Sequence, residues 1–96
     1  MALYIFARFE PRPGRETELL EELRRVLEPT RKEPGCIHIH LYESVRGPRC
    51  YFIHSKWTGE AAFEKHATLP HMTRFLSLMD ELISHPLHAV RTHQID

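Results

Sequence analysis

The chain has 96 residues, and its 13 acidic and 13 basic side chains give a formal charge of zero at pH 7. This length predicts one domain, residues 1–96, with a thin core that a second chain could extend. The balanced charge argues against nucleic acid as a partner, because that contact needs a basic face. There is no apolar run long enough for a membrane span and no recognisable signal peptide, so we expect no membrane partner. The two cysteines, Cys36 and Cys50, are too few for a disulfide framework and favour a cytoplasmic protein.

The first part of the chain reads as a strand followed by a helix. Residues 3–9 are aliphatic and aromatic and end at a turn that contains proline and glycine, which predicts a β-strand. Both faces of this strand are largely apolar, which indicates that it is covered on both sides. Over residues 15–30 the apolar side chains recur at helical spacing, and the charged ones, Glu22 among them, lie outside that stripe. We therefore expect a helix whose charged face meets solvent.

The rest of the chain predicts a hairpin, two helical stretches and a last strand. Residues 36–43 and 51–57 are separated by a short turn, so they predict an antiparallel hairpin. Thr58 is a suitable N-cap for the next helix, and Pro70 begins a second helical stretch. Residues 87–95 alternate as a final strand. The order β-α-β-β-α(α)-β is the ferredoxin-like arrangement, an α+β fold with an antiparallel sheet.

One face of this sheet would remain apolar without a partner. The helices suffice to cover a single face, and the other is expected to carry Tyr4, Phe6, Ile37, Ile39, Leu41 and Phe52. A second copy packed sheet to sheet would cover these side chains. We therefore expect a homodimer.

Histidine is abundant, with eight residues in the chain. A metal site could be imagined among His38, His40, His54, His66 and His71, but Glu43 and Glu64 are poorly placed to add a carboxylate. His54 is expected to face away from Ser55 and Trp57. Because there is also no glycine-rich phosphate loop and no dinucleotide fingerprint, we expect no metal and no other cofactor.

The register of the hairpin decides where most of these histidines point. If Ser44 pairs with Tyr51, the neighbours across the hairpin are His38 with Trp57, His40 with Ser55 and Tyr42 with Ile53. These side chains would then line a cavity beneath the helices that carry His66, His71 and Phe75. Such a cavity suits a planar aromatic ligand, although simple core filling explains the same residues equally well. A shift of one residue would disperse the set.

Three segments also match a known pattern: Arg8-Phe9-x-x-x-Pro13-Gly14, Glu33-Pro34-Gly35-Cys36, and Trp57-x-x-x-x-Ala62-Phe63-x-x-His66-x-x-x-x-His71. In these segments the chain resembles the antibiotic biosynthesis monooxygenase (ABM) family, whose members are small dimeric α+β barrel proteins. The resemblance implies a ligand cavity between sheet and helices in each subunit. It also implies cofactor-independent oxidation of a quinol-like or polyphenolic aromatic with O₂.

The resemblance implies that Trp57 lines the cavity and that His66 and His71 flank its helical wall, and the hairpin register adds further candidates. We expect His66, His38 or His40 to act as the catalytic base, and the substrate to contact Trp57, Tyr42, Ser55, His71, Phe75 and Ala7. Two positions depart from the family: Ser55 stands where many members have Glu, and Ala7 stands where haem-degrading relatives have Asn. A non-catalytic aromatic-binding or stress-associated dimer, and an isomerase of a small signalling molecule, remain alternatives because a fold does not fix a reaction.

Overall fold

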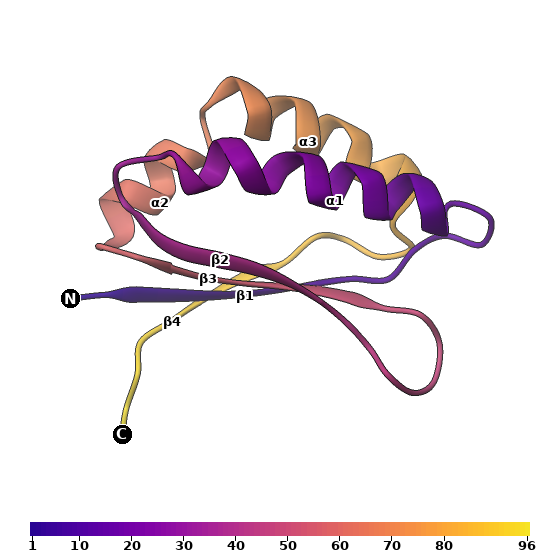
Figure 1. Ribbon diagram of the computed structural model, residues 1–96, viewed down its shortest axis with the longest axis horizontal. Helices are drawn as coiled ribbons and strands as arrows, with labels where there is room; N and C mark the ends of the chain where they lie inside the picture. The colour runs from indigo at the N-terminus through magenta and orange to yellow at the C-terminus, as the bar shows by residue number, and fades with distance from the viewer.

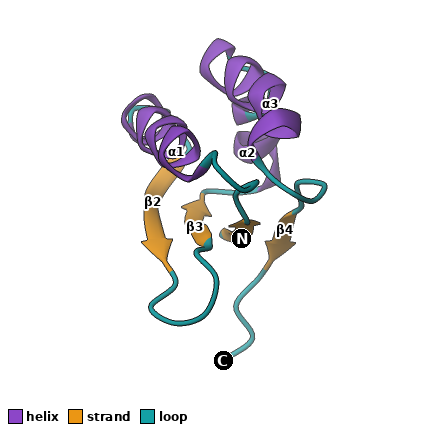
Figure 2. Ribbon diagram, turned by 90° about the vertical axis from the view of Figure 1, so that its right-hand side faces the viewer, coloured by secondary structure: helices purple, strands orange, loops and turns teal.

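Three helices cover one face of a four-stranded antiparallel sheet in the computed structural model, which describes residues 1–96 (Figure 1). The elements are β1 (Leu3–Phe9), α1 (Glu16–Arg31), β2 (Cys36–Glu43), β3 (Tyr51–Trp57), α2 (Glu60–His66), α3 (Pro70–Leu82) and β4 (Ala89–Thr92). The strand order is β2-β3-β1-β4. Seen end-on, α1 and the α2–α3 pair lie on the same side of the sheet (Figure 2). The predicted ferredoxin-like α+β fold is confirmed, and no helix is both long and apolar enough to cross a membrane.

The core lies between the sheet and the helices. Along β1 the side chains alternate, so that Ile5 and Phe9 are buried against the helices while Phe6, on the other face, is 51% exposed. From the helices the main buried contributors are Leu19, Leu23, Val26 and Leu27 of α1 and Phe75, Met79 and Leu82 of α3. One layer of helices thus covers the inner face only, and the outer face retains apolar side chains.

The hairpin register differs by one residue from the expected one. His38 pairs with Lys56, His40 with His54 and Tyr42 with Phe52, so the expected pairs with Trp57, Ser55 and Ile53 are wrong. Side chains alternate along a strand, and a shift of one residue therefore moves each of them to the opposite face. The observed register buries Ile39 (4% exposed) in the core, and Leu41 packs against it.

The outer face therefore has a different composition from the expected one. Ile39 and Leu41 were expected there and lie on the inner face instead. Ile37 is 51% exposed, beside an irregularity in the pairing between Cys36 and His38. Phe6 and Phe52 are exposed as expected.

Two element boundaries also differ. The N-cap of α2 is Gly59 and not Thr58, and no side chain caps this helix. The backbone N–H of Thr58 donates to the carbonyl of Gly35 at 3.0 Å, which keeps Thr58 attached to the start of β2. The last strand spans only Ala89–Thr92, because β1 offers it a ladder of only four residues, Tyr4 to Ala7.

Glu22 joins two helices and does not face solvent as expected. Its side chain is 10% exposed and accepts hydrogen bonds from both terminal nitrogens of Arg74, at 2.7 and 3.0 Å. This two-pronged contact links α1 to α3 above the core. Hydrogen bonding to Arg74 is the main reason why the pKa of Glu22 is lowered from its ordinary value, and burial opposes the shift.

We predict that Glu22→Gln lowers the free energy of unfolding at pH 7 by about 1 kcal/mol, since it replaces a charged hydrogen bond beside a half-exposed arginine. A carboxylate with a lowered folded-state pKa stabilises the fold above its unfolded-state pKa, and the effect is lost as the pH falls through the folded-state pKa. Urea unfolding should therefore show the difference between wild type and variant shrinking below about pH 4.5. A difference that stays constant with pH would contradict this role of Glu22.

Gly35 allows β2 and α2 to approach closely. A Cβ atom built on it would lie 2.3 Å from the Cβ of Ala62, a separation that real side chains do not reach. The contact holds the segment that precedes β2 against α2. Gly59 has more space, because its added Cβ would meet only the carbonyl oxygen of Met1 at 3.8 Å.

We predict that Gly35→Ala destabilises the protein by about 1–3 kcal/mol, the range that overpacking typically causes. Gly59→Ala is the matched control and should change stability much less, because its backbone is extended and its surroundings are open. Thermal and urea unfolding of both variants measures this. Equal effects would show that the approach of Gly35 to Ala62 is not a constraint.

Candidate functional site

A cavity of about 250 Å³ lies between the sheet and the helices. Its polar side chains are few, namely Thr30 from α1, Ser55 from β3 and His66 from α2. The remaining walls are apolar, and the full lining is Ile5, Ala7, Phe9, Val26, Thr30, Ile39, Ile53, Ser55, Phe63, His66, Ala67, Met72, Phe75, Leu76, Leu87 and Ala89. An apolar cavity with a few polar groups is typical of a small-molecule site.

Trp57 packs beside the cavity and contacts two of its polar residues, Ser55 and His66. It is 1% exposed, and its indole Nε1 donates a hydrogen bond of 2.9 Å to Ser55 Oγ. The centroids of the Trp57 and His66 rings are 4.6 Å apart. Because Ser55 accepts from an indole, its own hydroxyl proton remains free to donate towards a ligand.

The imidazole of His66 is held by a carboxylate that we did not single out as a functional group from the sequence. Glu33 Oε2 lies 2.7 Å from His66 Nδ1 and 2.8 Å from His71 Nε2. The Glu33 side chain is 9% exposed, and those of His66 and His71 are 6% and 23% exposed. Glu33 is the first residue of the Glu-Pro-Gly-Cys segment that carries part of the family resemblance. That segment was the one feature of the sequence that could have indicated a role for Glu33.

The environment of His66 favours the neutral ring with its proton on Nδ1. Burial is the main reason why its pKa is lowered from the ordinary value, and the hydrogen bond and charge of Glu33 oppose this shift. A carboxylate only accepts, so Nδ1 carries the proton, and Nε2 is then left with a lone pair. Nε2 makes no hydrogen bond with the protein, and the ring lines the cavity. His66 can therefore accept a proton from a ligand.

The other two histidines that we expected as bases lie on the opposite side of the sheet. His38 and His40 have ring centroids 5.2 Å apart, and His38 and His54 have theirs 5.4 Å apart. The three form a group with Lys56 on the outer face, because the observed register pairs them with one another. His54 does face away from Ser55 and Trp57, but it shares its face with His38 and His40.

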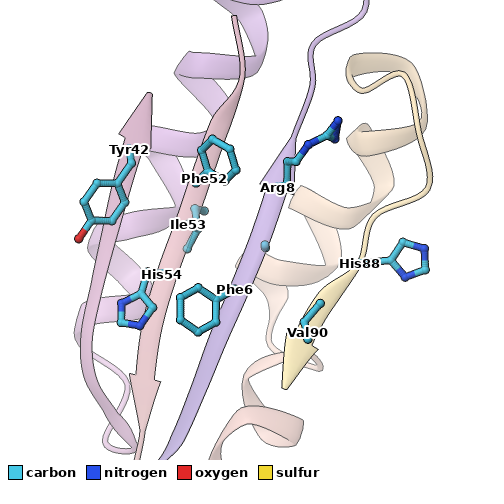
Figure 3. Close-up of a pocket in the computed structure, with 9 residues that line it drawn as sticks. Phe6, Arg8, Tyr42, Phe52, Ile53, His54, His88 and Val90 are labelled. Atoms are coloured by element: carbon cyan, nitrogen blue, oxygen red, sulfur yellow. The ribbon is translucent and has the colours of Figure 1, made fainter. Parts of the chain in front are cut away.

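A second hollow, of about 840 Å³, lies on this outer face (Figure 3). Tyr42, Phe52, Phe6 and Val90 are among the apolar residues that line it. His54 stands next to Phe6, with ring centroids 4.7 Å apart. Tyr42 therefore cannot contact a ligand in the inner cavity as we expected. Residues of the same four strands line both hollows, one on each face of the sheet.

Of the expected site residues, the structure places four on the inner cavity: His66, Ser55, Phe75 and Ala7. Trp57 and His71 are not part of this lining. Trp57 contacts the lining residues Ser55 and His66. His71 is connected to His66 through the shared carboxylate of Glu33. His38, His40 and Tyr42 are on the other face of the sheet because of the register. The cavity is thus assembled, with Glu33 as an additional member of the site.

The chain is similar to known proteins along most of its length. The sequence profile described as "Antibiotic biosynthesis monooxygenase" matches residues 2–77. "Putative monooxygenase Rv0793" of Mycobacterium tuberculosis is 31% identical over 83 residues, which cover 86% of this chain and 81% of that protein. "Putative monooxygenase YcnE" of Bacillus subtilis is 32% identical over 81 residues, which cover 84% and 85%.

A solved structure agrees with these sequence matches. The structure of Rv0793 matches this chain with a TM-score of 0.93 at 28% identity, covering 100% of this chain and 97% of that one. The profile match and the names of the relatives support a monooxygenase-like role on a small-molecule substrate. The segments that include Glu33, Trp57 and His66 thus pointed to the correct relatives: the chain belongs to the antibiotic biosynthesis monooxygenase family.

Proposed function

We propose that the protein is a monooxygenase that oxidises a small quinol-like aromatic in the inner cavity without a cofactor. The observation that carries this proposal is the imidazole of His66, hydrogen-bonded at Nδ1 to Glu33 and set in the wall of a largely apolar cavity. A cavity of about 150 Å³ can take one benzene ring. The volume here, about 250 Å³, therefore favours a substrate of one or two rings.

The chemistry needs a proton acceptor and a dry, shaped space. His66 Nε2 takes the phenolic proton, and the resulting phenolate is electron-rich enough to reduce O₂ itself. One oxygen atom enters the product and the other leaves as water, with all electrons supplied by the substrate. Glu33 stabilises the imidazolium that forms, since it accepts the Nδ1 proton in a hydrogen bond. Ser55 can donate a hydrogen bond to the developing oxyanion.

We predict oxygen uptake by the chelator-treated protein with one- and two-ring hydroquinones, and incorporation of ¹⁸O from ¹⁸O₂ into the product. His66→Gln should lower kcat about 10²–10⁴-fold, the usual contribution of a general base, while its amide can still donate to Glu33. His93→Ala, on the exposed C-terminal tail, is the matched control and should keep wild-type turnover. Oxygen electrode traces and circular dichroism of each variant measure rate and folding.

Three results would count against this function. Unchanged oxygen uptake by folded His66→Gln would exclude His66 as the base. Saturable binding of hydroquinones without any uptake would favour the alternative of a non-catalytic aromatic-binding protein. Conversion of a bound compound to an isomer without oxygen would favour the isomerase alternative.

We also propose that a second copy of the chain covers the outer face. The support is the exposure of large apolar side chains there, 51% for Phe6 and Tyr42 and 54% for Val90, on a sheet with helices on one side only. The cytoplasmic location expected from the cysteine content stays a prediction.

We predict that Phe6→Lys converts the protein from a dimer to a monomer, because it introduces a charge into the apolar outer face. Thr73→Lys is the matched control, since Thr73 is exposed on α3, on the helical side of the sheet. Sedimentation equilibrium of wild type and both variants gives the mass. A monomeric wild type, or a dimeric Phe6→Lys variant, would contradict the proposed packing.

A further inference from the structure

Glu33, His66 and His71 bring three metal-ligating atoms together from three separate segments. Each residue offers one ligand atom, a carboxylate oxygen or an imidazole nitrogen, and these atoms lie within 4.8 Å of one another. Glu33 Oε2 itself lies 2.7 Å from His66 Nδ1 and 2.8 Å from His71 Nε2. Glu33 comes from the connection between α1 and β2, His66 ends α2, and His71 stands in the first turn of α3. The three atoms converge without any rearrangement of the backbone.

The charge at this point also suits a cation. The oxygens of Glu33 are nearly buried, and no lysine or arginine nitrogen lies within 4.0 Å of them. Their only partners are the two imidazoles, which are ordinary ligands in the neutral form. A nearly buried carboxylate with no lysine or arginine beside it is a costly arrangement, and a divalent ion would lower that cost.

We propose that Glu33, His66 and His71 form a binding site for a divalent transition metal ion such as Zn²⁺ or Co²⁺. Two nitrogens and one carboxylate oxygen are a donor set that Zn²⁺ and its neighbours accept, with further positions left for water. Ligand atoms about 2.0–2.1 Å from one ion lie about 3.3 Å apart in tetrahedral geometry. The present contacts of 2.7 and 2.8 Å must therefore widen by about half an ångström, within the reach of side-chain rotation.

Occupation of this site would change what His66 offers to the cavity. With an ion on Nδ1, the remaining proton of the neutral ring is on Nε2. The ring would then present a donor to the cavity in place of the lone pair that takes the substrate proton. This consequence, unlike binding itself, rests on the proposed function, and it makes the ion an inhibitor of base-dependent turnover.

The test is a titration of the chelator-treated full chain with Co²⁺ and with Zn²⁺ alone. Calorimetry should show one ion per chain, and Co²⁺ should give a visible absorption spectrum typical of nitrogen and oxygen ligands. Glu33→Gln and His71→Gln should each weaken binding at least about tenfold while they preserve the hydrogen-bonding pattern. His40→Ala is the matched control, because it removes an imidazole from the competing histidine group on the outer face, and it should bind as wild type does.

Measurement on the unaltered protein keeps the proposal testable if a variant does not fold. On addition of Zn²⁺, the imidazole NMR signals of His66 and His71 should shift together, and those of His38, His40 and His54 should not. Shifts confined to the outer three, loss of binding in His40→Ala alone, or no saturable binding of either ion would overturn the proposal. Because none of these measurements uses turnover, their outcome is independent of whether the protein is a monooxygenase.

Discussion

The buried carboxylate of Glu33 is the interaction on which the arrangement of the site depends. A charge out of water requires donors close by, and here two imidazoles supply them at 2.7 and 2.8 Å. To do so, the end of α2 and the start of α3 must both face the segment before β2. The glycine at position 35 permits that approach, since any side chain there would collide with Ala62. The same pair of hydrogen bonds fixes the tautomer of His66 and therefore its chemistry at the cavity.

The sheet separates two surfaces of different character. On the inner side, an apolar cavity contains one fixed imidazole and two hydroxyl groups. On the outer side, aromatic residues lie next to His38, His40 and His54, with no carboxylate close to the three rings. The His38 pKa is lowered, first by burial and then by the neighbouring histidines and Lys56.

The inner cavity combines largely apolar walls with one imidazole whose orientation is fixed. The ring of His66 is hydrogen-bonded at one nitrogen and packed against Trp57. Ser55, on the strand side of the cavity, is held by the hydrogen bond that it accepts from the indole of Trp57. Under the proposed function, the proton acceptor therefore comes from the helical side of the cavity and not from the strand.

By itself, the sequence determined the order of the elements, the inner face of β1, the positions of His66, Ser55 and Phe75 at the cavity, and the family. The order of the elements and the inner face of β1 follow from periodicity and turn residues, which are properties of short stretches of chain. The family, and with it the place of His66 at the cavity, followed from the resemblance of three short motifs. Only the tertiary structure decided which face of the sheet His38, His40 and Tyr42 occupy. Isoleucine and histidine alternate along β2, and the pattern alone does not say which set faces the helices; packing of Ile39 into the core does. The hydrogen bonds of Glu33 to His66 and His71 could not be predicted from the sequence either. The two histidines lie 33 and 38 positions after Glu33 in the chain, and they meet it only when three segments converge in the folded structure.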